Sequence, residues 1–301
     1  MLKSWFIAMR PWSLTASFVP VALGTALASS QGFFDPFLFL LTAIAGMSVQ
    51  AGTNFINTYG DYISGVDTIE SAVTCPQLVT GAMQPSDMRT AGYIAFGIAA
   101  CIGILLSWVR GWEIIALGML GIIGGYTYTS GPYPYKYKGL GSFMVFFLMG
   151  PLMVWPAWFI QTGQHSWLPV FVAMPVSFLV AAILNGNDVR DIGHDQNAGI
   201  ITPAIGFGLD GGIHLHRLLY AGAFVSLFVL VALNILPPLC MLPFLLLPLG
   251  YRTLRTLRNV NPGMHECLLQ LEAMAAGLHF QFGILLIVGL LLQPFLAGKG
   301  F

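Results

Sequence analysis

Charged side chains are scarce in this sequence. Its 301 residues include only 12 Lys or Arg and 12 Asp or Glu, so 8% are charged and the formal net charge is zero. A soluble domain typically carries about 25% charged residues, and the lack of a basic excess gives no reason to expect nucleic acid as a partner. With 56% hydrophobic residues, the sequence indicates an all-α integral membrane protein.

Cysteine is rare as well. The four cysteines are widely separated, and no two of them form a Cys-x-x-Cys pair. This spacing argues against a zinc site and against a disulfide framework. We expect all four to be small apolar residues packed within the protein.

What the sequence has in abundance is long apolar runs. Nine of them suit a bilayer core of about 30 Å, which a helix of about 20 residues crosses. The nine runs lie at roughly 13–31, 37–57, 89–109, 113–130, 141–162, 167–187, 216–236, 238–256 and 273–296. The eighth contains Pro243 and Pro248, which membrane helices tolerate. We therefore expect residues 1–301 to form one membrane domain of nine transmembrane helices.

The few basic residues give this chain an orientation. Nine spans with a cytoplasmic N-terminus leave only Arg110 and Lys299 outside. The other Lys and Arg then lie on the cytoplasmic side: Lys3, Arg10, Arg89, Lys136, Lys138, Arg190, Arg217, Arg252, Arg255 and Arg258. This positive-inside asymmetry predicts a multi-pass protein of the cell (inner) membrane with its C-terminus outside. A cleaved signal peptide is the alternative reading of the first run, but that run completes the charge pattern as a retained helix.

Acidic residues cluster in two short strings, each at the end of an apolar run. Both strings begin with Asn-x-x-x-Asp, at Asn57/Asp61 and at Asn187/Asp191, and this repeat is consistent with an internal duplication. The Asn and Asp residues of the two strings are Asn57, Asp61, Asp67, Asn187, Asp188, Asp191 and Asp195. Residues four apart share one face of a helix, so Asn57 and Asp61 are expected on one helix face, and Asn187, Asp191 and Asp195 on another. The orientation places both strings on the cytoplasmic side.

So many carboxylates close together would repel one another and resist ionisation. A divalent cation removes this repulsion, and Mg²⁺ prefers oxygen ligands, usually a few carboxylates together with substrate phosphates. The sequence therefore favours an Mg²⁺ site built from two halves. The alternative is a solvated acidic loop at the membrane surface.

The segment between the fourth and fifth runs adds basic and aromatic side chains on the same side. It extends from Tyr126 to Gly141 and contains Tyr128, Lys136 and Lys138. Lysines beside a metal-bound diphosphate would neutralise its remaining charge, and tyrosine rings would stabilise a cation. An aromatic interface belt with snorkelling lysines is the equally weighted alternative.

These motifs resemble those of the UbiA superfamily of intramembrane prenyltransferases, most closely its menaquinone branch, the 1,4-dihydroxy-2-naphthoate prenyltransferases. The resemblance begins at Arg10-Pro-Trp-Ser and continues through Asn57 to Asp67, with its Gly-x-Asp ending. It also includes the Tyr126–Gly141 loop and the stretch from Asn187 to Thr202. Four motifs in the right order make the match specific.

The resemblance implies a nine-helix bundle around a central cavity, and Mg²⁺-dependent transfer of a polyprenyl group from its diphosphate to an aromatic ring. It implies that Asn57, Asp61, Asp191 and Asp195 hold the metal and the diphosphate. Asp67 and Asp188 would support the site or help to deprotonate the acceptor. The remaining substrate-binding or catalytic candidates are Arg10, Tyr128, Lys136, Lys138, Asn187 and Arg190.

The sequence departs from the family pattern at several positions. Thr58 stands where an Asp usually follows the Asn of the first motif, and Ile200 and Ile201 stand where Lys-Arg often follows the second motif. Arg10, Lys136, Lys138 and Arg190 would then carry the positive charge of the site. The acceptor is expected to be dihydroxynaphthoate-like, and 4-hydroxybenzoate, homogentisate or the futalosine-route naphthoate are alternatives within the superfamily.

A membrane transporter is the alternative from another functional class, since intramembrane acids also mark transport pathways. Transport acids are expected near the middle of a span. Here the clustered acids end their spans, which favours the enzyme. The sequence leaves the prenyl chain length and the oligomeric state undetermined.

Overall fold

The computed structural model describes residues 2–69, 72, 75–257, 268 and 270–296. Within these residues the regular elements are all helical. The α-helices are α1 (Leu2–Met9), α2 (Thr15–Ser29), α3 (Pro36–Ile63), α4 (Pro85–Arg110), α5 (Glu113–Thr127), α6 (Gly141–Leu148), α7 (Pro151–Thr162), α8 (Leu168–Arg190), α9 (Ile192–Asn197), α10 (Pro203–Ala232), α11 (Leu247–Thr256) and α13 (Leu271–Leu296). The 3₁₀ helices are η1 (Pro11–Leu14), η2 (Tyr135–Tyr137) and η3 (Pro238–Leu246).

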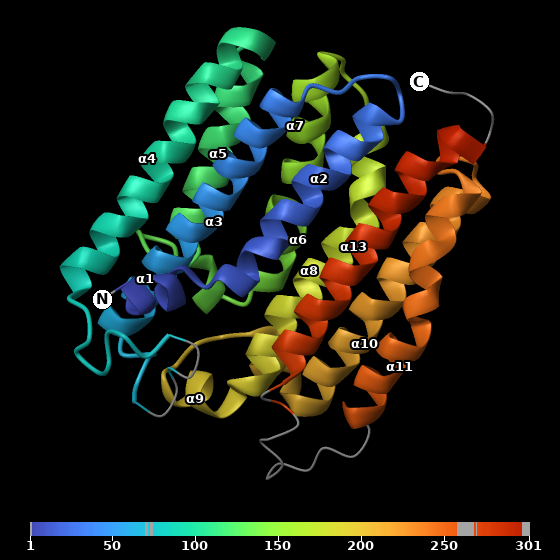
Figure 1. Ribbon diagram of the computed structural model, residues 1–301. Helices are drawn as coiled ribbons and strands as arrows, with labels where there is room; N and C mark the ends of the chain where they lie inside the picture. The colour runs from blue at the N-terminus through green and yellow to red at the C-terminus, as the bar shows by residue number, and fades with distance from the viewer. Residues whose placement is uncertain (1, 70–71, 73–74, 258–267, 269, 297–301) are drawn as a thin grey trace.

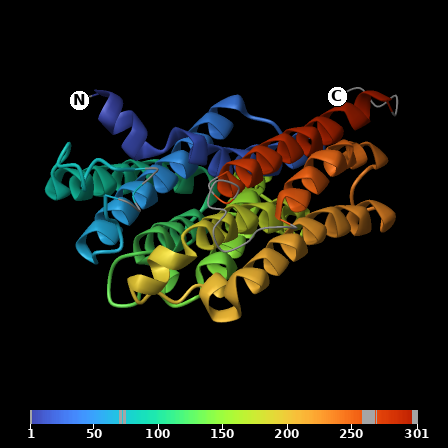
Figure 2. The same cartoon turned by 90° about the horizontal axis from the view of Figure 1, so that it is seen from below.

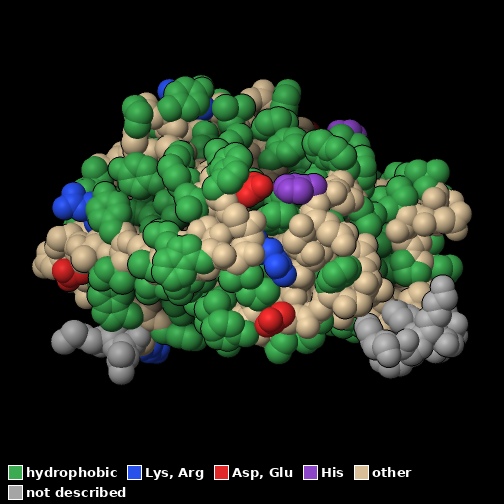
Figure 3. Space-filling view, turned by 90° about the horizontal axis from the view of Figure 1, so that it is seen from above, with side chains coloured by type: hydrophobic (Ala, Val, Ile, Leu, Met, Phe, Trp, Pro, Cys, Tyr) green, Lys and Arg blue, Asp and Glu red, His purple; other side chains and the backbone are tan. Residues whose placement is uncertain are grey.

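The long helices lie alongside one another in a bundle, with α1 and α9 at the same end (Figure 1). Seen from below, α2 in blue lies beside α13 in red, whereas α4 in teal and the orange helices lie at opposite sides of the bundle (Figure 2). The opposite end is covered mainly by hydrophobic side chains, with few charged ones among them (Figure 3). A polar site is therefore expected at the end that carries α9.

Local sequence signals explain where the longest helices begin. Asp35 precedes α3, and its Oδ1 accepts hydrogen bonds from the backbone N–H groups of Phe37 and Leu38. Thr202 does the same for α10 by accepting from the Ile205 N–H. In both cases proline follows the capping residue, where its missing N–H costs nothing.

The buried core lies where α2, α7, α8, α10 and α13 meet, and its largest fully buried side chains include Leu23, Trp158, Leu179, Leu227 and Phe282. Lipid tails are as apolar as these side chains, so membrane helices associate through close packing rather than through a hydrophobic driving force. Gly24 of α2 shows how close the packing is, because a Cβ there would lie 2.3 Å from the Val154 carbonyl oxygen of α7.

Seven of the expected spans are confirmed as helices long and apolar enough to cross a membrane. They are Lys3–Ser30, Pro36–Ile63, Pro85–Arg110, Gly141–Thr162, Leu168–Arg190, Pro203–Ala232 and Leu271–Gln293. The other two expected spans are irregular or short: α5 has 15 residues, and 238–256 divides into η3 and α11. The total of nine spans and the membrane orientation therefore stay predictions.

The contacts of these two segments nevertheless lie at opposite ends of the bundle. Before α5, Arg110 donates to the Ile160 and Gln161 carbonyls at the end of α7. In the loop after α5, Lys136 contacts Asp61 at the end of α3. The segment that begins with η3 starts beside Gly289, late in α13. Beyond α11, Leu257 belongs to a buried cluster with residues at the start of α13.

Candidate active site

A cavity of about 770 Å³ lies within the bundle. Its walls come from α2, α3, α4, α5, α7, α8 and α13, and most of the side chains along them are apolar. Charged side chains gather where α3 and α8 end, beside α9. The cavity therefore joins an apolar interior to one polar end, which is the arrangement expected for a ligand with a charged head and an apolar tail.

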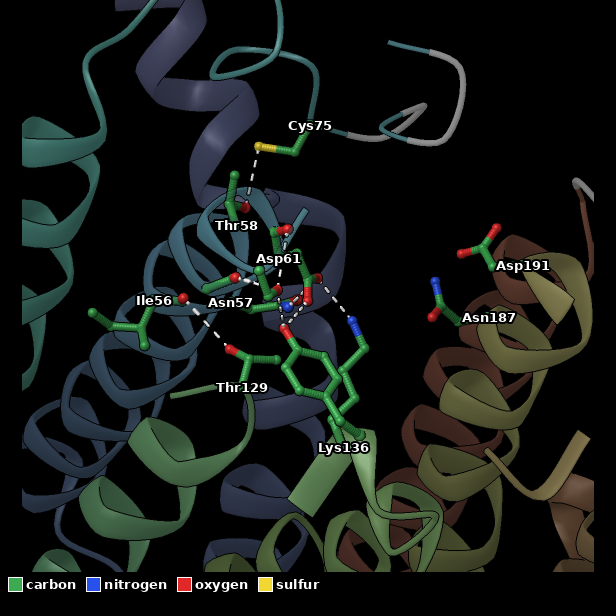
Figure 4. A network of polar contacts seen from close by, with 12 residues as sticks. Ile56, Asn57, Thr58, Asp61, Cys75, Thr129, Lys136, Asn187 and Asp191 are labelled. Carbon is green, nitrogen blue, oxygen red and sulfur yellow. Dashed lines mark hydrogen bonds and ion pairs between the residues drawn. The ribbon is translucent and has the colours of Figure 1, made fainter. Parts of the chain in front are cut away.

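The first aspartate motif forms the last turns of α3. Asn57 and Asp61 are both buried, and the Asn57 amide donates to Asp61 Oδ2 at 2.5 Å. The expectation that these two residues share a helix face is confirmed. Two side chains from the loop after α5 complete the surroundings of Asp61: Lys136 Nζ donates to Oδ2 at 2.8 Å and the Tyr137 hydroxyl donates to Oδ1 at 2.5 Å (Figure 4).

Lys136 is the buried cation of this half of the site. Burial by itself lowers its pKa, but Asp61 and Tyr137 raise it, and the net result is a pKa above that of an ordinary lysine. The ammonium is therefore charged, and it also lies 5.7 Å from the centre of the Tyr128 ring. This geometry combines the positive charge with the aromatic face that the sequence predicted for this loop.

Arg10 approaches the same motif from the N-terminal side. It lies between α1 and η1 in a left-handed backbone conformation (φ 54°), which a residue with a side chain adopts at a cost of about 1–2 kcal/mol. Its guanidinium donates to Asn57 Oδ1 at 3.4 Å and to Thr58 Oγ1 at 3.2 Å, and Thr58 donates to Cys75 Sγ at 3.4 Å. Thr58 thus accepts from Arg10 as a neutral hydroxyl.

The second motif lies at the break between α8 and α9. Asp191 follows the last residue of α8, and Arg190 donates to both of its carboxylate oxygens, at 2.7 and 2.6 Å. Asp195 belongs to α9 and is buried. The single helix expected to carry Asn187, Asp191 and Asp195 ends at Arg190 and α9 begins at Ile192, yet all three side chains line the same cavity.

Two carboxylates outside the membrane spans have pKa values that are raised toward neutral pH. Burial raises the pKa of Asp67 to about 6, and the negative charge of Asp61 adds to the effect. Burial likewise raises the pKa of Asp195 to about 6, against the opposing influence of Lys136. Both side chains line the cavity, so each is able to exchange a proton near neutral pH.

The structure brings most of the predicted residues to the cavity. Those that line it are Arg10, Asn57, Asp61, Asp67, Tyr128, Lys136, Asn187, Arg190, Asp191 and Asp195. Asp188 is buried but does not line it. Lys138 is exposed and also lies outside the lining, and its backbone pairs with that of Ile201.

Two residues that the motif analysis missed also belong to this region. Tyr137 donates to Asp61, as described above, and Glu272 at the start of α13 forms an ion pair with Arg190. Tyr137 was hidden among the other aromatic residues of its loop. Glu272 carried one signal in the sequence, since it directly precedes the last apolar run and is the only acidic residue of α13.

The donor set fits a divalent cation held together with a ligand. Among the described residues, no group of three His, Cys, Asp or Glu side chains is close enough to hold an ion without help. Asp61 lies on one side of the polar end, and Asp191 and Asn187 lie on the other (Figure 4). Mg²⁺ is commonly bound by one or two carboxylates, water and substrate phosphates, and two separated carboxylates satisfy that requirement when a diphosphate lies between them.

The fold and the cavity define a helical membrane protein with an apolar chamber that carries acidic and basic side chains at one end. The chain belongs to the UbiA prenyltransferase family, whose sequence pattern matches residues 17–268. It is therefore a prenyltransferase, and the prediction of an enzyme is favoured over the alternative of a transporter. Overall similarity to curated proteins extends over almost the whole chain, as two examples illustrate.

The 1,4-dihydroxy-2-naphthoate octaprenyltransferase of Bacillus subtilis is 32% identical over 287 residues, which cover 95% of this chain and 91% of that protein. The UbiA prenyltransferase domain-containing protein 1 of Homo sapiens is 31% identical over 295 residues, which cover 97% of this chain and 84% of that protein. Both alignments include the two aspartate motifs within their extent.

Solved structures of UbiA homologues have the same fold. The apo UbiA homologue from Aeropyrum pernix K1 superimposes with a TM-score of 0.65 at 18% identity, covering 91% of this chain and 96% of that one. The UbiA homologue from Archaeoglobus fulgidus bound to GPP and Mg²⁺ gives a TM-score of 0.62 at 15% identity, covering 95% of this chain and 99% of that one. At these identities the likeness concerns the fold.

Proposed function

We propose that this protein transfers a polyprenyl group from polyprenyl diphosphate to a 1,4-dihydroxy-2-naphthoate-like aromatic acceptor in menaquinone or related quinone biosynthesis. The observation that carries the proposal is the cavity: an apolar chamber of about 770 Å³ ends at a cluster of Lys136, Arg10, Arg190 and two aspartate motifs. A prenyl diphosphate has the same two parts, a long apolar chain and a charged head. The Bacillus subtilis relative, named for a naphthoate acceptor, supports the choice of acceptor.

In this proposal the polar end binds the diphosphate. Lys136 and Arg10 approach it from the side of the first motif, and Arg190 approaches from the second. Each provides a charge-assisted contact to phosphate oxygens. These cations are already held in place by Asp61, Asn57 and Asp191, so little reorganisation is needed as negative charge grows on the departing diphosphate.

Asp61 and Asp191, helped by Asn57 and Asp195, are the residues that would hold Mg²⁺. When bound, the ion would neutralise the diphosphate and thereby favour cleavage of the bond to the prenyl carbon. Asp67 is the candidate for accepting the proton that the aromatic ring loses, since it lines the cavity with a pKa raised to about 6. The apolar walls would exclude water from the reactive prenyl carbon.

Several finer statements belong to the same proposal. The protein would lie in the cell (inner) membrane as one domain of nine spans, with its N-terminus and the polar end of the cavity on the cytoplasmic side. Another aromatic acceptor, such as 4-hydroxybenzoate, homogentisate or the futalosine-route naphthoate, is the alternative within the family. Animal proteins of the family match this chain as well, so the identity of the acceptor is the most specific part of the proposal.

The direct test combines a strain and a purified protein. Lipids extracted from a strain that lacks this protein are expected to have lost one prenylated quinone, which mass spectrometry identifies. The protein in lipid nanodiscs is then expected to form the matching product from a polyprenyl diphosphate and dihydroxynaphthoate. An unchanged quinone profile together with no product from any of the four acceptors would contradict the proposal.

A further inference from the structure

Glu272 is far in sequence from both aspartate motifs, yet it lines the same cavity. It lies in the first turn of α13 and is the only acidic residue of that helix. An acid there is favoured by the helix dipole, but this effect needs no partner. The contacts of Glu272 show that it has two partners, both from the second motif.

Arg190 divides its guanidinium between two carboxylates. Nε and Nη2 donate to the two oxygens of Asp191, at 2.7 and 2.6 Å, and Nη1 donates to Glu272 Oε2. The Arg190 side chain is only 8% exposed, so these carboxylates, rather than water, satisfy it. Asn187, one turn earlier in α8, also donates to Glu272 Oε2, at 3.5 Å.

The backbone fixes Glu272 beside the motif. A Cβ on Gly186 would lie 3.1 Å from the Glu272 backbone nitrogen and 3.2 Å from its Cα. The backbones of α8 and α13 therefore approach each other closely at this point, which the missing side chain of Gly186 allows. The Glu272 carboxylate is held at the second motif by helix packing and not by a flexible connection.

This arrangement matters because Asp191 has two competing uses. Its carboxylate is bound by Arg190 at both oxygens, and the proposed function needs it as a ligand of a divalent cation. If Asp191 were the only partner of the guanidinium, turning it toward the cation would leave a buried positive charge unpaired, which is costly. Glu272 offers Arg190 a second carboxylate that remains when Asp191 turns away.

We infer that Glu272 is a positioning residue, which holds the Arg190 guanidinium so that the Asp191 carboxylate is released to bind the divalent cation. The inference rests on the proposed metal-dependent function. The competing account makes the Arg190–Glu272 pair a structural link between α8 and α13. That account expects a change in thermal stability and no change in metal binding.

The test measures Mn²⁺ binding to the full-length protein in lipid nanodiscs by electron paramagnetic resonance, with inorganic diphosphate present. Glu272→Gln keeps the size of the side chain and removes its charge, and a lost charge-assisted contact is expected to raise the Mn²⁺ Kd about tenfold or more. Glu272→Asp keeps the charge and is expected to stay close to the wild type. Glu113→Gln is the matched control, because Glu113 pairs with His165 at 3.9 Å, is only partly buried and lies outside the cavity lining.

A second comparison shows whether Glu272 acts through Arg190. In an Arg190→Gln background the competing cation is gone, so adding Glu272→Gln is expected to leave the Mn²⁺ Kd unchanged. The coupling between the two substitutions is then the signature of positioning. If Glu272→Gln alone does not fold, the Mn²⁺ Kd of the double variant is compared with that of Arg190→Gln to decide whether Glu272 acts through Arg190. Glu272→Asp then serves as the folded single variant.

Two results would overturn the inference in distinguishable ways. A Glu272→Gln protein that binds Mn²⁺ like the wild type, with only its melting temperature lowered, would make the pair structural and leave the proposed function standing. A wild-type protein that binds no Mn²⁺ in the presence of diphosphate would remove the metal-dependent function itself, and the inference with it.

Discussion

Lys136 Nζ lies 2.8 Å from Asp61 Oδ2, and this ion pair joins the end of α3 to the loop that follows α5. Both side chains are almost fully buried, with exposed fractions of 10% and 6%. Removing one partner of a buried pair costs about 3–5 kcal/mol, because the other charge is left uncompensated. The pair therefore contributes to the fold as well as to the site, and experiments on either residue must separate the two effects.

Asp61 and Asp191 are expected to be essential for turnover. Asp61→Asn and Asp191→Asn each remove a carboxylate from the polar end of the cavity, and the rate of prenyl transfer should fall at least about 100-fold, as for other electrostatic groups at a reacting centre. Thermal unfolding provides the check on the fold. Asp61→Asn combined with Lys136→Met should regain stability without regaining activity, whereas recovery of activity in that double variant would place the role of Asp61 in folding.

Lys136 and Lys138 are expected to differ sharply, although only one residue separates them. Lys136 lines the cavity and Lys138 does not. Each charge-assisted contact to phosphate is worth about 1.5–3 kcal/mol, so Lys136→Met should lower kcat/KM for the prenyl diphosphate about 10- to 150-fold. Lys138→Met is the matched control and should remain near the wild-type value. Equal losses in the two variants would contradict the geometry described here.

Removal of divalent cations should abolish activity. The purified protein in lipid is expected to lose turnover in excess EDTA and to regain it with Mg²⁺ or Mn²⁺, because the two separated carboxylates bind diphosphate through an ion. The measurement is product formation across a titration of free metal. Full activity in the presence of the chelator would end the metal-dependent mechanism.

Glycines on α5 should control the length of the prenyl chain. Gly118 and Gly121 line the cavity, and a Cβ at either position would have no atom within 4 Å. Leucine at Gly118 or Gly121 would therefore extend into free space and fill it. We expect kcat/KM for the longest usable donor to fall by the equivalent of about 1–3 kcal/mol, the usual cost of overpacking, while shorter donors are spared.

The control for this prediction is Gly97→Leu on α4. A Cβ on Gly97 also has no atom within 4 Å, but Gly97 does not line the cavity. It should leave the length preference unchanged. A loss that is the same for donors of every length in the Gly118 and Gly121 variants would indicate damage to packing and not a shortened chamber.

Topology reporters should alternate as nine spans require. A reporter near Asn197 should lie in the cytoplasm, and reporters near Asn234 and after Phe301 should lie outside. A further reporter near Pro262 tests whether the η3–α11 segment crosses the membrane, because it should be cytoplasmic if the segment does so. Finding the Asn234 and Pro262 reporters on one side would reduce the number of spans.

Much of the fold followed from local patterns in the sequence. Seven apolar runs correspond to helical stretches of the described residues that are long and apolar enough to cross a membrane, because run length and hydropathy are properties of a continuous segment. The two remaining runs were harder to interpret, since prolines in 238–256 favour 3₁₀ geometry over a regular helix. The break at Asp191 was also missed, because spacing by four residues indicates a shared face only if the helix continues.

The sequence by itself determined that this protein is a membrane protein, that its acids gather at the ends of two apolar runs, and that Asn57 and Asp61 share a helix face. These features depend on composition and on the period of a single helix. Only the tertiary structure decided that Lys136 lies inside the cavity and Lys138 outside it, and that Glu272 meets Arg190. Arg190 and Glu272 are 82 residues apart, and such pairings depend on how helices and loops pack together, which no local pattern encodes.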